Sequence, residues 1–207
     1  MIYITGDTHG EFERFGSKHF SGGLGDYLII CGDFGGVWDD SHQEQYWRKW
    51  LSRKPFTTLF IDGNHENYDR LSAYPVTEWH GGKVQRIADN IFHLMRGQVF
   101  EIDDVRFFTF GGASSHDIDA GILEPDDPDF AAKRKKLDRE RALYRVNRVS
   151  WWAEEEQEEG LRNLEKYQYQ VDCILELCDF KICLFGHYPA NERVGKNLCC
   201  WMTRYLY

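Results

Sequence analysis

The segment "MIYITGDTHGEF", residues 1–12, joins a short apolar run to a polar turn that carries an acid and an imidazole. The apolar run is typical of a short buried strand that ends in a Gly-Asp turn. The same order of apolar run, glycine and polar residue returns in "DYLIICGDFG", residues 26–35, and in "FTTLFIDGNHEN", residues 56–67. The repetition predicts three strands, each followed directly by polar side chains.

A helix is predicted between the second and third of these strands. The stretch "DDSHQEQYWRKWLSRK", residues 39–54, places Tyr46, Trp47, Trp50 and Leu51 at helical spacing, so that they form one apolar face. Strand, helix and strand in this order indicate an α/β domain with parallel strands. Sheets of this kind place their ligand sites at the carboxyl ends of the strands.

The chain changes character after the third strand. Short strands are expected in residues 82–115, with a hairpin turn at 102–105, and they suggest a second, more antiparallel sheet segment. Residues 116–152 are strongly charged, and the basic run "KRKKLDRER" lies between acidic stretches, which favours a solvated, salt-bridged surface over a nucleic-acid patch. An outer helix is expected over residues 154–168, and apolar strand-like sequence returns in residues 171–187.

Length and charge limit the class of protein. The chain has 207 residues, 42% of them hydrophobic, and we expect one domain over residues 1–207. A formal charge of −9 makes nucleic acid an unfavourable partner.

The first residues lack a basic leader and no apolar run is long enough to cross a membrane, so we expect a cytoplasmic protein without membrane association. The six cysteines form no CxxC pair and are expected to be buried thiols. Oligomeric state is not predicted.

Taken singly, each polar turn has the features of an ordinary capped turn, but together the turns indicate a metal site. Four expected strand ends supply oxygen and imidazole ligands to one edge of a sheet, and these residues are Asp7, His9, Asp33, Asn64, His65 and His187. Manganese, iron and zinc accept such ligands, and a carboxylate can bridge two ions. Two ions about 3.5–4 Å apart would clamp the attacking and leaving oxygens of a phosphoryl group.

The ordered motifs "GDTHG", "GDFGG", "GNHEN" and "FGHY" resemble those of the calcineurin-like metallophosphoesterases. The resemblance implies a four-layer α/β/β/α sandwich and two divalent metal ions, with manganese as the leading candidate and iron or zinc as alternatives. By this likeness Asp7 and His9 would bind the first ion, and Asp33 would bridge both. Asn64 and His187 would bind the second ion. His65 would stabilise the phosphate and protonate the leaving oxygen, while a metal-bound hydroxide attacks phosphorus.

The sequence departs from the family's pattern in ways that bear on these ligands. Pro189 stands where the family has the last histidine, a ligand of the first ion, and no histidine occurs between Asp172 and Phe185, where the family has a Thr-His motif. We therefore expect a fold shortened near the C-terminus and one protein ligand fewer for each ion. Water could complete the shells, another histidine such as His116 could move in, or the centre could be incompletely filled. Gly36 also replaces a helper acid that many members carry.

Two functions from different classes fit these observations. The leading hypothesis is a metal-dependent hydrolase of a phosphomonoester or phosphodiester. The alternative is a metal-binding or interaction module that keeps the fold while the missing histidines impair turnover. The acidic segment after His116 favours a small phosphorylated substrate over a large polyanion. Trp38 and Tyr68 come just after the predicted ligand loops, so each could contact the substrate or simply pack against its neighbours. The aromatic cluster "YWRKW" is expected to pack in the core or against it.

Overall fold

A six-stranded sheet forms the centre of the fold. The computed structural model describes residues 1–113, 115, 117–156, 182–185, 193–194 and 198–200. The strands of the sheet are β1 (Ile2–Gly6), β2 (Tyr27–Cys31), β3 (Thr57–Ile61), β4 (Val76–Trp79), β5 (Gly82–Ala88) and β6 (Ile91–Leu94). Their spatial order is β1-β2-β3-β6-β5-β4. The first four strands of this order are parallel, and β5 and β4 are antiparallel to their neighbours. The predicted mixed α/β class is confirmed.

The three predicted N-terminal strands end level with one another. Gly6 at the end of β1 lies opposite Cys31 of β2, and Cys31 lies opposite Ile61 of β3. A 3-10 helix, η1 (Phe12–Phe15), follows β1, while α1 (His42–Ser52) connects β2 to β3 and α2 (Tyr68–Ser72) follows β3. The Ser41 side chain caps α1 by accepting a hydrogen bond from the Glu44 N–H group. The loops after β1, β2 and β3 therefore leave the sheet at the same edge.

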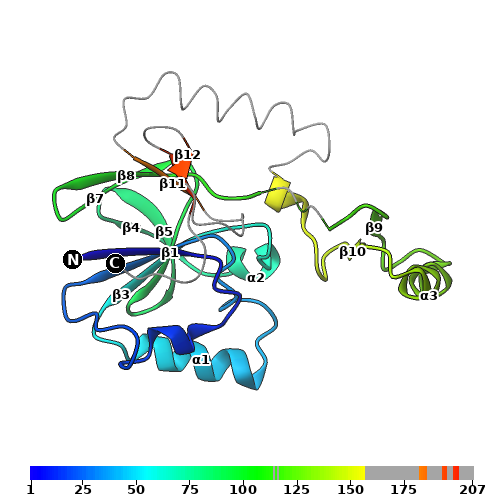
Figure 1. Ribbon diagram of the computed structural model, residues 1–207, viewed down its shortest axis with the longest axis horizontal. Coiled ribbons are helices and arrows are strands. Elements are labelled where there is room, and N and C mark those ends of the chain that lie inside the picture. The colour runs from blue at the N-terminus through cyan, green and yellow to red at the C-terminus, as the bar shows by residue number, and fades with distance from the viewer. Residues whose placement is uncertain (114, 116, 157–181, 186–192, 195–197, 201–207) are drawn as a thin grey trace.

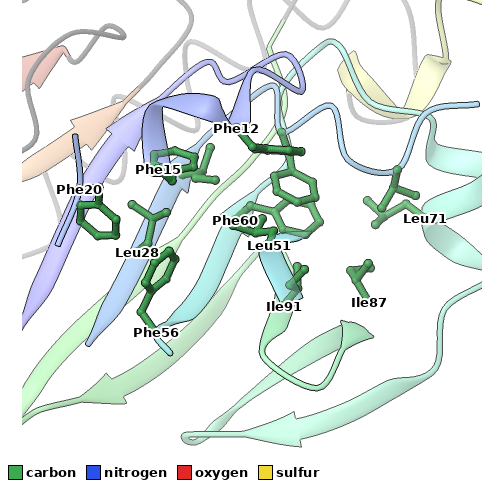
Figure 2. Close-up of a cluster of buried hydrophobic side chains, with 13 residues drawn as sticks. Phe12, Phe15, Phe20, Leu28, Leu51, Phe56, Phe60, Leu71, Ile87 and Ile91 are labelled. Carbon is green, nitrogen blue, oxygen red and sulfur yellow. The ribbon is translucent and has the colours of Figure 1, made fainter. Parts of the chain in front are cut away.

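Apolar side chains cover both faces of the sheet, because successive residues of a strand point to opposite sides. Leu28 and Ile30 of β2 belong to the cluster that contains Leu51 of α1, which Figure 2 shows. Ile29, between them in sequence, belongs to the opposite cluster, which contains Phe100. Phe100 lies on β7 (Gln98–Ile102), so a helix layer packs on one face of the sheet and a second β layer on the other. The two clusters fix the orientation of the three strands that precede the predicted ligands.

Within the described ranges, the second β layer contains the antiparallel pair β7 (Gln98–Ile102) and β8 (Val105–Thr109). Its two-residue turn, Asp103 and Asp104, has φ values of 48° and 62°, as a type I′ hairpin requires, and this confirms the turn predicted at 102–105. The prediction that residues 82–95 belong to the second sheet was wrong, since β6 pairs with β3 and brings β5 into the main sheet.

The charged segment forms a separate projection, and we call residues 117–152 the arm. It contains β9 (Ile122–Leu123), α3 (Phe130–Glu140) and β10 (Arg145–Val146), which stand to one side of the sheet in Figure 1. No side chain of α3 is buried, in agreement with the predicted solvated surface. None of the helices in the described ranges is long and apolar enough to span a bilayer.

The C-terminal part is described only in pieces. These are the 3-10 helix η2 (Ala153–Glu156) and the strands β11 (Cys183–Phe185), β12 (Arg193–Val194) and β13 (Leu198–Cys200). The three strands form a small sheet in the order β11-β13-β12. The helix predicted over 154–168 and the shortening predicted between 172 and 185 lie almost entirely outside the described residues.

Candidate metal centre

Three strand ends bring most of the predicted ligands to one place. Asp7, Asp33 and Asn64 follow β1, β2 and β3, and their exposed fractions are 6%, 4% and 2%. Isolated buried carboxylates are costly, so two of them near one another indicate a site built for a positively charged partner. His9 is the more accessible member, with 51% of its side chain exposed.

Close approach of the loops makes glycine necessary at one position. A Cβ atom on Gly63 would lie 2.1 Å from Asp33 Oδ1 and 2.5 Å from the Asp33 backbone nitrogen. A Cβ atom on Gly32 would lie 3.5 Å from Asp7 Oδ1 and 3.6 Å from the Gly63 Cα atom. The Asp7 carboxylate thus lies close to Gly32 and the Asp33 carboxylate close to Gly63. Glycine at position 63 is what allows the Asp33 carboxylate to lie against the loop after β3.

The backbone at the first two strand ends is strained. Asp7, His9 and Asp33 have φ values of 41°, 46° and 49°, a region that residues other than glycine enter at a cost of roughly 1–2 kcal/mol each. Hydrogen bonds hold the two loops together, since the His9 N–H group donates to the Asp33 carbonyl at 2.7 Å. The Thr8 hydroxyl donates to the Phe34 carbonyl at 2.7 Å. These contacts maintain the strained conformations and aim three predicted ligands at one region.

The predicted catalytic histidine lies beside this group. The His65 N–H group donates to Asp33 Oδ1 at 2.9 Å, and the His65 and His9 rings are 5.3 Å apart between centroids. His9 Nε2 lies 3.6 Å from Asp33 Oδ2. The Asn64 amide nitrogen donates a hydrogen bond to the Ser115 hydroxyl at 3.1 Å, which orients the amide.

Arg145 of the arm is a site residue that the sequence reasoning missed. Its Nη2 atom lies 3.1 Å and 3.2 Å from the two ring nitrogens of His65. The guanidinium is held by Asp117, whose two carboxylate oxygens lie 3.0 Å from Nε and 2.6 Å from Nη2, and by the Ser150 carbonyl at 3.0 Å from Nη1. A planar guanidinium fixed in this way is suited to an anionic oxygen beside His65.

The charges around His65 act in both directions on its pKa. Burial lowers the pKa of the imidazole most, and the positive charge of Arg145 lowers it further, while the Asp33 carboxylate opposes the change. The buried Glu66 carboxylate accepts a hydrogen bond from the Phe34 N–H group at 2.8 Å. Burial, with the nearby Asp33, raises the pKa of Glu66 well above its ordinary range.

A buried ionic network supports the loop after β3. Asp62, 2% exposed, accepts hydrogen bonds from His93 at 3.0 Å, from Arg96 Nε at 2.6 Å and from the Tyr68 hydroxyl at 3.0 Å. Burial alone would raise the pKa of Asp62, but the His93 hydrogen bond and the Arg96 charge together lower it well below its ordinary value. His93 is therefore structural. The Tyr68 hydroxyl also lies 2.6 Å from the Gly63 carbonyl oxygen, so it braces the loop that carries Asn64 and His65.

The donor set matches divalent cations, although part of it lies outside the described residues. His187, Pro189 and His116 fall outside the ranges that the structure describes. Within those ranges, no three or more His, Cys, Asp or Glu side chains are arranged as a ready set of metal ligands. Two buried carboxylates, an oriented amide and an imidazole nevertheless offer the oxygen and nitrogen donors that manganese, iron and zinc accept. The residues present thus fit the metals that the motifs imply.

Comparison with known proteins identifies a family and a group of relatives. The family model described as calcineurin-like phosphoesterase matches residues 1–191. The chain is 28% identical to the human (Homo sapiens) lariat debranching enzyme over 143 residues, which are 59% of this chain and 25% of that enzyme. It is 27% identical to the Drosophila melanogaster lariat debranching enzyme over 170 residues, 72% of this chain and 30% of that enzyme. The chain thus spans about a quarter of the length of these relatives. No solved structure matches significantly.

Proposed function

Because this chain belongs to the calcineurin-like phosphoesterase family, we propose that it hydrolyses a phosphomonoester or phosphodiester at the carboxyl edge of its sheet. One observation carries the proposal. Asp7, His9, Asp33, Asn64 and His65 come from three different strand ends, and their side chains or adjoining backbone lie within a few ångströms of one another. Neither the packing of the core nor the capping of turns requires this gathering of donors.

The proposed roles follow the geometry of these residues. Asp7 and His9 would hold one divalent ion, Asp33 would contact both, and Asn64 with His187 would hold the second. Such ions supply Lewis acidity and lower the pKa of water. Arg145 would bind a non-bridging phosphate oxygen next to His65. His65 would donate a hydrogen bond to the ester and give a proton to the leaving oxygen. The negative charge of a bound ester favours the protonated form of His65 and so offsets the lowering of its pKa.

A diester is the ester class that we propose first. The relatives are named as lariat debranching enzymes, which are debranching phosphodiesterases. The net charge of −9 and the Asp117 carboxylate beside Arg145 favour a small diester over a long polyanion.

Hydrolysis of bis(4-nitrophenyl) phosphate and 4-nitrophenyl phosphate with added Mn²⁺, alongside metal analysis of the purified protein, tests the proposal. We expect turnover that a chelator abolishes and that Asp33→Ala and His65→Ala lose. Asp33→Ala should also lose bound metal, whereas His65→Ala should keep it. Wild-type turnover no greater than that of both variants would contradict the enzymatic function. A wild type that binds metal without turnover would support the second candidate, the impaired metal-binding module, which Pro189 favours.

A further inference from the structure

A cavity adjoins the candidate metal centre and belongs to none of the roles above. Its volume is about 300 Å³, and His9 and His65 form part of its wall. The remainder comes from Gly10 and Phe12 after β1, from the loop after β2 and from the first turns of α1, and includes Trp38, Gln43 and Trp47. The cavity is therefore continuous with the place where a phosphate would meet His65.

The walls of this cavity suit a flat apolar group. Trp38 and Trp47 are both half-buried, so each indole leaves part of its surface uncovered. An aromatic ring that stacks on indole removes apolar area from water and gains from the facing π-systems. Gln43, exposed at the rim, offers an amide to the edge of such a ring. Asp39, Ser41 and Glu44 also line the cavity, so it combines two indoles with several polar groups. Aromatic side chains beside polar groups that fix orientation are features of small-molecule subsites.

The wall that carries Trp38 is held in place before any ligand arrives. The buried Glu44 carboxylate accepts hydrogen bonds from the N–H groups of Trp38 and Asp39, both at 2.7 Å. The Trp38 carbonyl accepts one from the Asn67 amide at 2.7 Å. On its other side, Trp38 meets the ring of Trp152 edge-on at 5.4 Å. A preorganised wall loses little conformational entropy when a ligand binds.

We propose that this cavity is a subsite for a planar aromatic group of the phosphate ester, either an aryl ring that carries the ester oxygen or a nucleobase attached through its sugar. The inference rests on the proposed function, because a phosphate bound at His65 would direct the group attached to it into this cavity. It adds the substrate feature that the metal ligands do not supply, namely recognition of a ring next to the reacting phosphorus.

The test compares binding of two phosphonates that cannot be hydrolysed, phenylphosphonate and methylphosphonate, by titration calorimetry of the full chain with Mn²⁺. We expect phenylphosphonate to bind about tenfold more tightly, the size of one aromatic stack. The preference should fall toward unity in Trp47→Leu and in Trp38→Leu, which alter separate walls. Trp50→Leu is the matched control, because Trp50 lies on the same helix and packs against Trp47 at 5.3 Å without lining the cavity. AMP against ribose 5-phosphate distinguishes a nucleobase from a simple aryl group.

Each outcome separates the subsite from the hydrolytic function. Equal binding of the two phosphonates by the wild type, or a preference unchanged in both cavity variants, would overturn the subsite. Binding of neither phosphonate would overturn the subsite together with the phosphate site. A preference for phenylphosphonate without turnover of any ester would uphold the subsite and reject the hydrolysis. Thermal melts of each variant show that it is folded, and the two walls give independent variants.

Discussion

Substitution of Gly63 by alanine is the sharpest test of how the site is assembled. The added Cβ would lie 2.1 Å from Asp33 Oδ1 and 2.5 Å from the Asp33 backbone nitrogen, so Asp33 or the loop after β3 must move by roughly 1 Å to restore ordinary contact. Overpacking of this kind costs about 1–3 kcal/mol of stability. In a chain of this size that corresponds to a fall of roughly 2–12 °C in Tm.

The effect on function should exceed the effect on stability. A displacement of about 1 Å in a catalytic group costs on the order of 100-fold in rate. We therefore expect Gly63→Ala to stay folded at 25 °C, to bind less Mn²⁺ and to lose about 100-fold in kcat/KM for bis(4-nitrophenyl) phosphate. Gly23→Ala is the control, since a Cβ there meets only Asp26 Oδ2 at an ordinary 3.7 Å. Wild-type metal content and activity in Gly63→Ala would refute the assignment of Asp33 to the centre.

Three further changes test other parts of the structure. Arg145→Lys should keep the positive charge but lose the planar arrangement of N–H donors, which lowers kcat/KM about tenfold with unchanged Tm. Kinetics equal to those of wild type would show that Arg145 does not bind the phosphate. Folding lowers the pKa of Asp62, so its contribution to stability is complete above its unfolded pKa of about 3.9 and is lost as the pH falls. The difference in unfolding free energy between wild type and Asp62→Asn should therefore narrow by about 1–2 kcal/mol from about pH 5 to about pH 2.5. A constant difference in urea titrations would contradict the ionic network around Asp62. His187→Ala should lose the second ion first by metal analysis, and unchanged stoichiometry would reject His187 as a ligand.

The parts of the fold that follow from local pattern were predictable. The strands that became β1, β2 and β3 and the helix α1 were recognised from apolar runs and helical spacing, and the Asp103-Asp104 turn from its residues. The β5–β6 pair was assigned to the wrong sheet because an alternating strand has the same pattern whichever sheet it joins. Only the pairing of β6 with β3 decides the matter, and that contact is not local.

The candidate site likewise contains residues that short stretches of sequence predict and residues that they do not. Its ligand residues stand next to glycines at strand ends, a signal that can be read from short windows of sequence. Arg145 reaches His65 from 80 positions away, out of a segment whose charges were interpreted correctly as mostly solvated. Trp47 was expected to pack, yet it also borders the cavity, because a half-buried indole on a helix can do both. Such assignments require the three-dimensional arrangement of the arm and loops.

The arm has a consequence for how this protein can diversify. Among the residues that the structure describes, neither apolar cluster of the sheet includes one beyond Phe107, and α3 buries no side chain. The arm nevertheless delivers Arg145 to His65 and Trp152 to Trp38. Changes in α3 can therefore accumulate without loss of these two clusters, whereas Trp152, 1% exposed, is buried and constrains its own end of the arm. If the proposed function holds, substitutions close to Arg145 would alter the surroundings of the bound phosphate and leave the proposed metal ligands unchanged.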